Sequence, residues 1–144
     1  MITAKVADQE IDVARFASAP LPKGHGACDL FLGMVRDHND GKPVEAVTYD
    51  AYVPVAEKVL REIATEVKDR WGTELQIEVL HRTGRLKVGE ASVAIRVTAP
   101  HRDEAFQGCR YIIEEIKTRV PVWKKEHYVD GETDWLRGHA LCSH

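Results

Sequence analysis

The segment VEAVTYDAYVPVAEKVLREIATEVKDRWGTELQIEVL, residues 44–80, sets the fold of this chain. Residues 44–52 alternate between two faces, which is typical of a half-buried strand. Pro54 then stands where the first turn of a helix accepts proline, and apolar residues recur at every fourth position over 55–71, which predicts an amphipathic helix. Alternation returns over 75–79 and predicts a second strand. A strand, a helix and another strand therefore follow one another without a long break.

The same kind of pattern continues downstream of this segment. Residues 84–89 begin and end with glycine and are expected to turn the chain into a strand over 93–97. An apolar stripe over 102–117 predicts a second helix, and a short strand follows at 122–123. The order β-α-β-β-α-β is the ferredoxin-like motif. It predicts an α+β sandwich with both helices on one face of a mostly antiparallel sheet.

Upstream of this motif, the sequence predicts additional N-terminal strands. Residues 27–35 are strand-like, residues 39–43 form a turn, and the Pro- and Gly-rich stretch 18–26 forms a loop after a short N-terminal element. We therefore expect the ferredoxin-like sandwich to carry an α/β hammerhead-like elaboration. Because no repeat or long linker divides the chain, residues 1–144 are expected to form a single domain.

The composition narrows the class of protein. The chain has 144 residues, of which 44% are hydrophobic and 30% are charged, as in ordinary globular proteins. Its net charge is -3, so no overall positive field draws it to nucleic acid or to an anionic membrane. Any site for an anion must therefore come from a local cluster of basic residues.

Targeting and metal-binding signals are absent from the sequence. Residues 1–16 lack an apolar core, which argues against a secretory signal, and nowhere do about 18 apolar residues run together. The three cysteines, Cys28, Cys109 and Cys142, form no C-x-x-C pair and are odd in number. We therefore expect a cytoplasmic protein with no disulfide framework, no membrane span and no bound metal or other cofactor.

Basic residues stand at the ends of predicted elements in three places. Residues 33–39 (GMVRDHN) leave a strand, residues 99–102 (APHR) join a strand to a helix, and residues 117–126 (KTRVPVWKKE) join a helix to a strand. His101 and Arg102 begin a helix, where free N–H groups and the helix dipole favour an anion. The alternative is that a basic residue stands at a helix start by chance, on an exposed loop.

Lys117 and Lys124 allow two interpretations. Lys117 in a last helical turn complements the helix dipole, and Lys124 can be the outward-facing half of a strand alternation. If both ammonium groups instead face one pocket, each disfavours the charge of the other, which gives a lysine able to transfer protons or act as a nucleophile. Sequence spacing leaves both interpretations open.

The remaining motifs argue against several classes of enzyme. The other histidines show no spacing of metal ligands and are interpreted as structural. They are His25, His38, His81, His127, His139 and His144. The chain has no G-x-x-x-x-G-K-[ST], G-x-S-x-G or G-x-G-x-x-G, so ATP-binding, serine-hydrolase and dinucleotide-binding functions have no support. The residues alone thus predict a small α+β domain with a basic anion pocket.

At the three basic segments the chain closely resembles the large, catalytic subunit of molybdopterin synthase. The matching stretches are GACDLFLGMVRDHN (26–39), HRTGRLKVGE (81–90), APHRDEAF (99–106) and IKTRVPVWKKE (116–126). The combination of K-T-R-x-P-x-W-K with an upstream H-R and G-x-V-R is very specific. Four such blocks in this order are not expected by chance.

The resemblance implies a sulfurtransferase of molybdenum cofactor biosynthesis. Members of the family convert cyclic pyranopterin monophosphate (precursor Z) to molybdopterin by installing two sulfurs. The sulfur arrives as a thiocarboxylate on the C-terminal Gly-Gly of a small ubiquitin-like sulfur-carrier subunit, and two catalytic subunits form a homodimer within a heterotetramer. Both the cyclic phosphate and the thiocarboxylate are anions, which a local basic cluster would bind.

The resemblance also implies catalytic roles for two residues. Lys117 and Lys124 look like the essential lysines of the family and are expected to contact the substrate. We expect Lys117 to handle protons or covalent intermediates, and Lys124 to stabilise developing negative charge. Lys125 and Glu126 flank the site and are weaker candidates for substrate binding.

Five further residues resemble the family's substrate contacts. Arg36, with the adjoining backbone of Met34 and Val35, is similar to a substrate-contacting segment. His101 and Arg102 are similar to the contacts to phosphate and pterin, and are expected to reach the site across a homodimer interface.

Three alternative functions are weighed against this one. An inactive homologue would serve as a scaffold for the small subunit, and a phosphate-ester hydrolase on the same fold would act without a sulfur donor. An RNA-binding module has the same order of elements, but aromatic residues are only 7% and the net charge is negative. Outside residues 26–126 the resemblance is loose, so contacts from Arg137 or His139 are left undecided.

Overall fold

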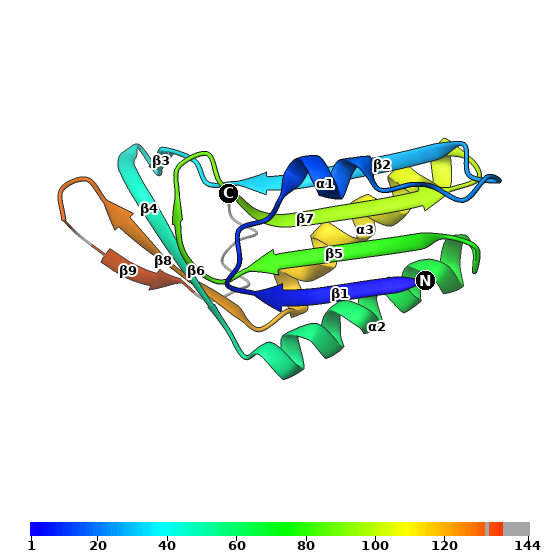
Figure 1. Ribbon diagram of the computed structural model, residues 1–144. Coiled ribbons are helices and arrows are strands. Elements are labelled where there is room, and N and C mark those ends of the chain that lie inside the picture. The colour runs from blue at the N-terminus through cyan, green and yellow to red at the C-terminus, as the bar shows by residue number, and fades with distance from the viewer. Residues whose placement is uncertain (132, 137–144) are drawn as a thin grey trace.

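Two β-sheets and three helices make up the computed structural model, which describes residues 1–131 and 133–136 (Figure 1). The first sheet has the strand order β1-β5-β7-β2. Its strands are β1 (Ile2–Ala7), β5 (Gln76–Arg82), β7 (Ala91–Ala99) and β2 (Ala27–Met34). β1 runs parallel to β5, whereas β7 is antiparallel to both of its neighbours. β7 is buried along its whole length because both faces of this sheet are covered.

The helices lie on opposite faces of the first sheet. α2 (Val53–Trp71) and α3 (Arg102–Arg119) cover one face, and the short helix α1 (Val13–Ser18) packs on the other (Figure 1). α2 begins with Pro54 in its first turn and ends at Gly72, whose φ of 141° lies in the region that favours glycine. Among the described residues, no helix is both long and apolar enough to span a bilayer.

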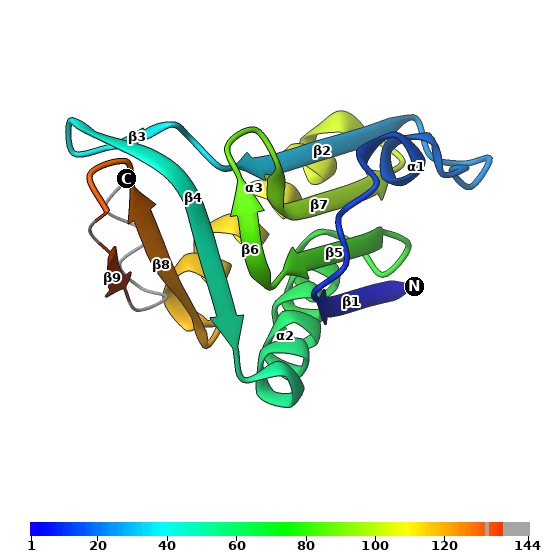
Figure 2. The same cartoon turned by 60° about the vertical axis from the view of Figure 1, so that its left-hand side comes forward.

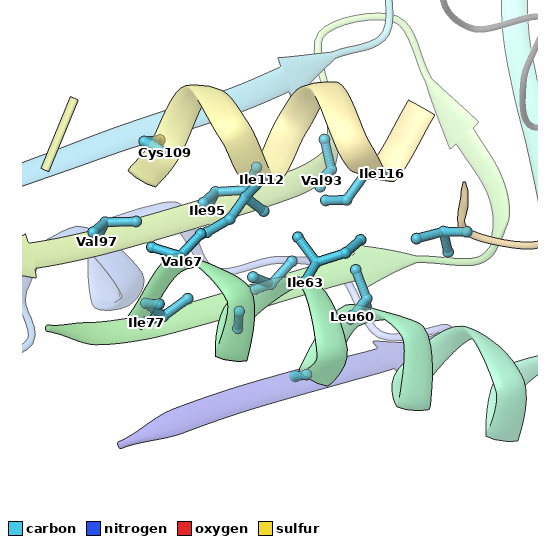
Figure 3. Close-up of a cluster of buried hydrophobic side chains, with 14 of the residues drawn as sticks. Leu60, Ile63, Val67, Ile77, Val93, Ile95, Val97, Cys109, Ile112 and Ile116 are labelled. Atoms are coloured by element: carbon cyan, nitrogen blue, oxygen red, sulfur yellow. The ribbon is translucent and has the colours of Figure 1, made fainter. Parts of the chain in front are cut away.

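The main core fills the space between the first sheet and the two long helices (Figure 3). Leu60 and Ile63 of α2, Ile112 of α3 and Ile95 of β7 all lie in this core, and all four side chains are fully buried. Each such side chain contributes about 1.5–3 kcal/mol relative to an exposed position. This layer fixes where the C-terminal end of α3 lies relative to the sheet.

A second sheet stands at the end of the first one (Figure 2). Its strands are β3 (His38–Asn39), β4 (Lys42–Ala51), β8 (Val122–Tyr128), β9 (Thr133–Leu136) and β6 (Gly84–Lys87), which pairs with β4. A small apolar cluster that includes Val35, Val44, Val47 and Leu86 stabilises it. The chain reaches this sheet from α3 through Val120 and Val122, both buried in the main core.

The structure confirms the α+β class, and the elements β4-α2-β5-β7-α3-β8 follow the predicted order β-α-β-β-α-β with the short strand β6 inserted between β5 and β7. The first and last strands of that order pair with each other in the second sheet, and the N-terminal strands β1 and β2 flank β5 and β7. The expected turn over 84–89 was wrong in part, because Gly84–Lys87 forms β6. Leu86 is fully buried there, so pairing with β4 stabilises a segment whose glycines suggested only a turn. The single domain over 1–144 stays a prediction.

Candidate active site

A cavity of about 280 Å³ lies where the two sheets meet the C-terminal end of α3. The described residues that line it are Phe31, Gly33, Met34, Arg36, Tyr49, His81, Ser92, Val93, Ile113, Ile116, Lys117 and Lys124. Three of these residues are basic and none is acidic, so the cavity attracts an anion although the whole chain is acidic. Its volume is near the lower end of the range for small-molecule sites.

The structure brings Lys117 and Lys124 to the same cavity. Lys117 lies in the last turn of α3 and is half-buried. Lys124 lies in β8 opposite Tyr49 of β4, and it is only 8% exposed. Lys125, the next residue along the strand, pairs with Thr48 and does not line the cavity. Of the two interpretations of the lysine spacing, the structure thus selects convergence on one pocket.

Lys124 is held by a buried carboxylate. Its Nζ lies 3.1 Å from Oε1 of Glu126, which is 2% exposed. The amide of Asn39 donates to both Glu126 oxygens, at 3.0 and 2.8 Å, and the Tyr128 hydroxyl donates to Oε2 at 2.6 Å. Burial raises the pKa of Glu126, but hydrogen bonds from Tyr128, Lys124 and Asn39 outweigh burial and hold that pKa below its usual value. Glu126 therefore lies behind Lys124 as a fixed negative charge and does not line the cavity.

The segment that carries Arg36 is fixed by its backbone. A Cβ on Gly33 would come within 2.6 Å of Val93 Cγ1, so β2 approaches β7 more closely than another residue allows. The Val35 N–H donates to the Glu90 carbonyl at 2.9 Å, and the Gly89 N–H donates to the Val35 carbonyl at 2.8 Å. The side chain of Val35 is buried in the apolar cluster of the second sheet.

This arrangement aims the residues on either side of Val35 at the cavity. Met34 and Arg36 are exposed side chains that line it. Of the three residues predicted to contact the substrate here, Met34 and Arg36 have side chains that line the cavity. The side chain of Val35 does not line it, and only its backbone lies nearby.

His101 and Arg102 lie far from the cavity of their own protomer. Both are exposed at the start of α3, where His101 Nδ1 is 3.9 Å from Glu104 Oε1. Fifteen residues separate Arg102 from Lys117, which corresponds to about 22 Å along the helix at about 1.5 Å per residue. One protomer therefore does not bring these two residues together with the lysines. Arg137 and His139 lie outside the described residues.

Three polar residues of the cavity were missed by the sequence analysis. His81 was interpreted as structural, and Tyr49 and Ser92 were not singled out. The ring of Tyr49 packs edge-on against that of His81, with centroids 5.4 Å apart, and burial raises the pKa of Tyr49 despite its hydrogen bond with Ser92. His81 opens the quoted block HRTGRLKVGE, which was the one available signal. No sequence pattern marks Tyr49 or Ser92.

No group of three or more His, Cys, Asp or Glu side chains within residues 1–131 and 133–136 is placed to hold a metal ion. The polar groups that face the cavity are ammonium, guanidinium, imidazole and hydroxyl groups. Such a set binds an anionic organic molecule and can donate protons to it.

Comparison with known proteins identifies the family. A family model described as MoaE protein matches residues 6–119. The molybdopterin synthase catalytic subunit of Synechococcus elongatus is 48% identical over 118 residues, which cover 82% of this chain and 72% of that protein. The X-ray crystal structure of molybdopterin synthase from Staphylococcus aureus has a TM-score of 0.85 at 33% identity, covering 92% of this chain and 96% of that chain.

A complex of subunits 1 and 2 of the molybdopterin-converting factor from Helicobacter pylori also contains this fold. Its matching chain has a TM-score of 0.71 at 18% identity, covering 91% of this chain and 88% of that chain. At this identity the likeness concerns the fold alone. The family match and the closer relatives agree with the resemblance found in the four sequence blocks. The chain therefore belongs to the MoaE family of molybdopterin synthase catalytic subunits, enzyme subunits of molybdenum cofactor biosynthesis.

Proposed function

We propose that this chain transfers sulfur to cyclic pyranopterin monophosphate and so makes molybdopterin, using the thiocarboxylate of a small ubiquitin-like subunit. The observation that carries the proposal is the convergence of Lys117, Lys124 and Arg36 on one cavity, with no acidic residue among the described residues that line it. The substrate phosphate and the thiocarboxylate are both anions, so each is attracted to this cavity. Membership of the family supplies the reaction, and the cavity supplies groups suited to it.

The two lysines take different roles in this proposal. Lys124 is nearly buried and ion-paired to Glu126, so its ammonium group is positioned to stabilise negative charge that develops when sulfur attacks the substrate. Lys117 is half-buried in the last turn of α3 and lines the same cavity. It handles the proton transfers or the covalent intermediate that accompany sulfur attack. Arg36 binds the phosphate as a planar fork.

His101 and Arg102 complete the site from a second copy of the chain. They lie at the opposite end of α3 from Lys117, so they contact the substrate only across a homodimer interface. β2 is an edge strand of the first sheet, and Leu30 of this strand and Phe106 of α3 are exposed large apolar residues. Phe106 has 59% of its surface exposed. These features suit a surface that a second copy covers.

The proposed assembly also includes the small subunit. Two catalytic subunits would form the centre of a heterotetramer, and one small subunit would dock at each cavity with its C-terminal tail inserted. The Helicobacter pylori complex of subunits 1 and 2 gives a precedent for such pairing in a protein of this fold. We further place the protein in the cytoplasm, since Cys28 and Cys109 are free thiols that suit a reducing compartment.

Reconstitution with defined components tests the proposal. The purified chain is mixed with thiocarboxylated small subunit and cyclic pyranopterin monophosphate, and the dithiolene product is assayed. We expect product from the wild type and none from Lys117→Ala, whose fold is retained because the side chain is only half-buried. Lys58→Ala is the matched control: Lys58 is an exposed lysine of α2 outside the cavity, so full activity is expected.

The other outcomes separate the alternative functions. If the wild type binds the small subunit but makes no product, the chain is an inactive scaffold. Release of phosphate without any sulfur donor would indicate a phosphate-ester hydrolase. Full activity of Lys117→Ala would remove this lysine from the mechanism.

A further inference from the structure

His81 is a polar residue of the cavity that the sulfur-transfer chemistry does not use. It ends the buried alternation of β5, on the same face as Ile77 and Val79, and only 4% of it is exposed. Tyr49 of the second sheet packs edge-on against its ring. The ring is thus clamped between the two sheets at the wall of the cavity.

The hydrogen bonding of His81 fixes its tautomer. Nδ1 lies 3.1 Å from the carbonyl oxygen of Arg82. A carbonyl oxygen only accepts, so Nδ1 carries the hydrogen and Nε2 presents a lone pair. Burial lowers the pKa of His81 to about 4 and outweighs the opposing hydrogen bond to the Arg82 backbone, so the ring is neutral at pH 7.

Nε2 keeps contact with the cavity. No hydrogen bond to this atom is found within residues 1–131 and 133–136. The side-chain atoms of this part of the chain that are both sealed from solvent and without a partner are Asn39 Oδ1, Arg82 Nε and Arg96 Nε. Nε2 is not one of them, so this atom is not sealed from solvent, and its residue lines the cavity.

The rest of the cavity is rich in hydrogen-bond donors and poor in acceptors. Arg36, Lys117 and Lys124 are donors only. The Ser92 hydroxyl donates its hydrogen to the Gly33 carbonyl at 3.1 Å and also hydrogen-bonds with Tyr49, so its remaining capacity is as an acceptor. The carboxylate of Glu126 does not line the cavity, and its oxygens are occupied by Lys124, Asn39 and Tyr128. Nε2 of His81 is therefore an uncharged acceptor that adds to the hydroxyl oxygens of Tyr49 and Ser92 in a cavity otherwise lined by charged donors.

We propose that His81 is a substrate-binding residue whose Nε2 accepts a hydrogen bond from an N–H group of the bound pterin ring. A reduced pterin carries ring N–H and amino groups, and each such donor costs free energy if it is buried without an acceptor. The cationic side chains bind the phosphate and stabilise charge, and His81 orients the ring. This assignment rests on the proposed function, because that function supplies the pterin.

Two substitutions of His81 separate hydrogen bonding from packing. His81→Asn keeps an amide N–H near the Nδ1 position but places no acceptor at the Nε2 position. His81→Gln is longer and carries its amide oxygen to that position. We expect KM for cyclic pyranopterin monophosphate to rise about tenfold in the Asn variant with kcat nearly unchanged, and to return most of the way to the wild-type value in the Gln variant.

His127→Asn is the matched control in the same assay. His127 lies in β8, its Nε2 is 2.7 Å from Thr48 Oγ1, and it does not line the cavity. Its substitution should leave both KM and kcat unchanged. Thermal unfolding of each variant shows whether the fold is retained. If the Asn variant does not fold, His81→Met replaces it, because methionine fills a similar volume with only a weak acceptor.

The outcomes distinguish a failure of the His81 assignment from a failure of the proposed sulfur-transfer function. An unchanged KM in a folded Asn variant overturns the assignment of His81. A Gln variant as impaired as the Asn variant does the same, because the loss would then come from packing. If the wild type itself makes no product, the sulfur-transfer function fails and this assignment fails with it. Product from the wild type without the expected KM pattern removes only the role of His81.

Discussion

Glu126 places one negative charge in the interior, where it is surrounded by hydrogen-bond donors. Lys124, Asn39 and Tyr128 each direct an N–H or O–H group at its two oxygens. Because a carboxylate only accepts, the whole arrangement depends on this residue remaining ionised. Lys124 in turn depends on it for its position at the cavity.

We expect Glu126→Gln to disturb both stability and activity. The amide –NH₂ would face a donor, so the free energy of unfolding should fall by about 1–3 kcal/mol and activity by on the order of 10- to 100-fold as Lys124 shifts. Chemical denaturation and the reconstituted assay measure the two effects. Glu114→Gln is the control, since Glu114 pairs with Arg110 on the surface and should change stability by less than about 0.5 kcal/mol. Equal effects of the two substitutions would contradict the role given to Glu126.

The buried neutral ring of His81 predicts a dependence of stability on pH. Its pKa is about 4 in the folded protein and about 6.5 in the unfolded chain, so the unfolded chain binds the extra proton first. This contribution to stability is present above about pH 6.5 and is lost as the pH falls toward 4. Between pH 7 and pH 5, the wild type should lose about 2 kcal/mol more than His81→Gln in denaturant unfolding. Parallel pH profiles for the two proteins would show that His81 titrates normally.

The turn between β6 and β7 positions the segment that leaves β2. Lys87 N–H donates to Glu90 Oε1 at 3.0 Å, and the other Glu90 oxygen pairs with Arg82 of β5. Hydrogen bonds from the Lys87 backbone and from Arg82 outweigh burial and lower the pKa of Glu90, which favours its ionised form. The backbone of this turn binds Val35, so the ion pair controls the placement of the adjoining Arg36.

Glu90→Gln should therefore weaken substrate binding from a distance. Arg82 is mostly buried and would lose its counter-charge, so we expect a lower free energy of unfolding and a severalfold rise in KM through Arg36. Denaturation and steady-state kinetics measure these changes. Glu45→Gln is the control. Glu45 of β4 forms an exposed ion pair with Arg85 of β6, so its substitution should have little effect on stability or KM. A stable variant with unchanged KM would show that Arg36 is positioned by other contacts.

The distance between the two ends of α3 makes the proposed site a property of a dimer. Lys117 and Arg102 lie at opposite ends of an 18-residue helix. In a two-fold dimer, each cavity would combine Lys117 of one protomer with Arg102 of the other. A complementation experiment with two variants shows whether the two residues act in the same or in different protomers.

Mixing two inactive variants gives that test. A mixed dimer of Lys117→Ala and Arg102→Ala chains would contain one cavity with both substitutions and one with neither. Random exchange after unfolding and refolding should therefore restore roughly a quarter of the wild-type activity per chain, although each variant alone is inactive. Restored activity is measured in the reconstituted assay, with dimer exchange followed by size-exclusion chromatography or mass spectrometry. No restoration in confirmed mixed dimers would place both residues at the same protomer's site.

Local pattern was enough to specify the class of fold and most of its elements. Local patterns mark the elements concerned: a four-residue period marks α2, alternation marks β5 and β7, and turn residues separate them. Because each pattern depends only on neighbours along the chain, it can be predicted from the sequence. The four resembling blocks likewise identified Lys117, Lys124 and Arg36, which the structure gathers at one cavity. β6 was mistaken for a turn because its pairing with β4 is a long-range contact.

Tertiary structure decided the remaining features, because they depend on residues far apart in the chain. β4 and β8 pair in a second sheet because packing of the two layers, and not chain order, selects strand partners. His81 became part of the cavity through Tyr49, 32 positions away by residue number, and Glu126 became a buried charge through Asn39. Proximity of this kind leaves no period or spacing in the sequence. The two lysines could therefore be singled out from local blocks, whereas the residues that surround them in the cavity were set by the fold.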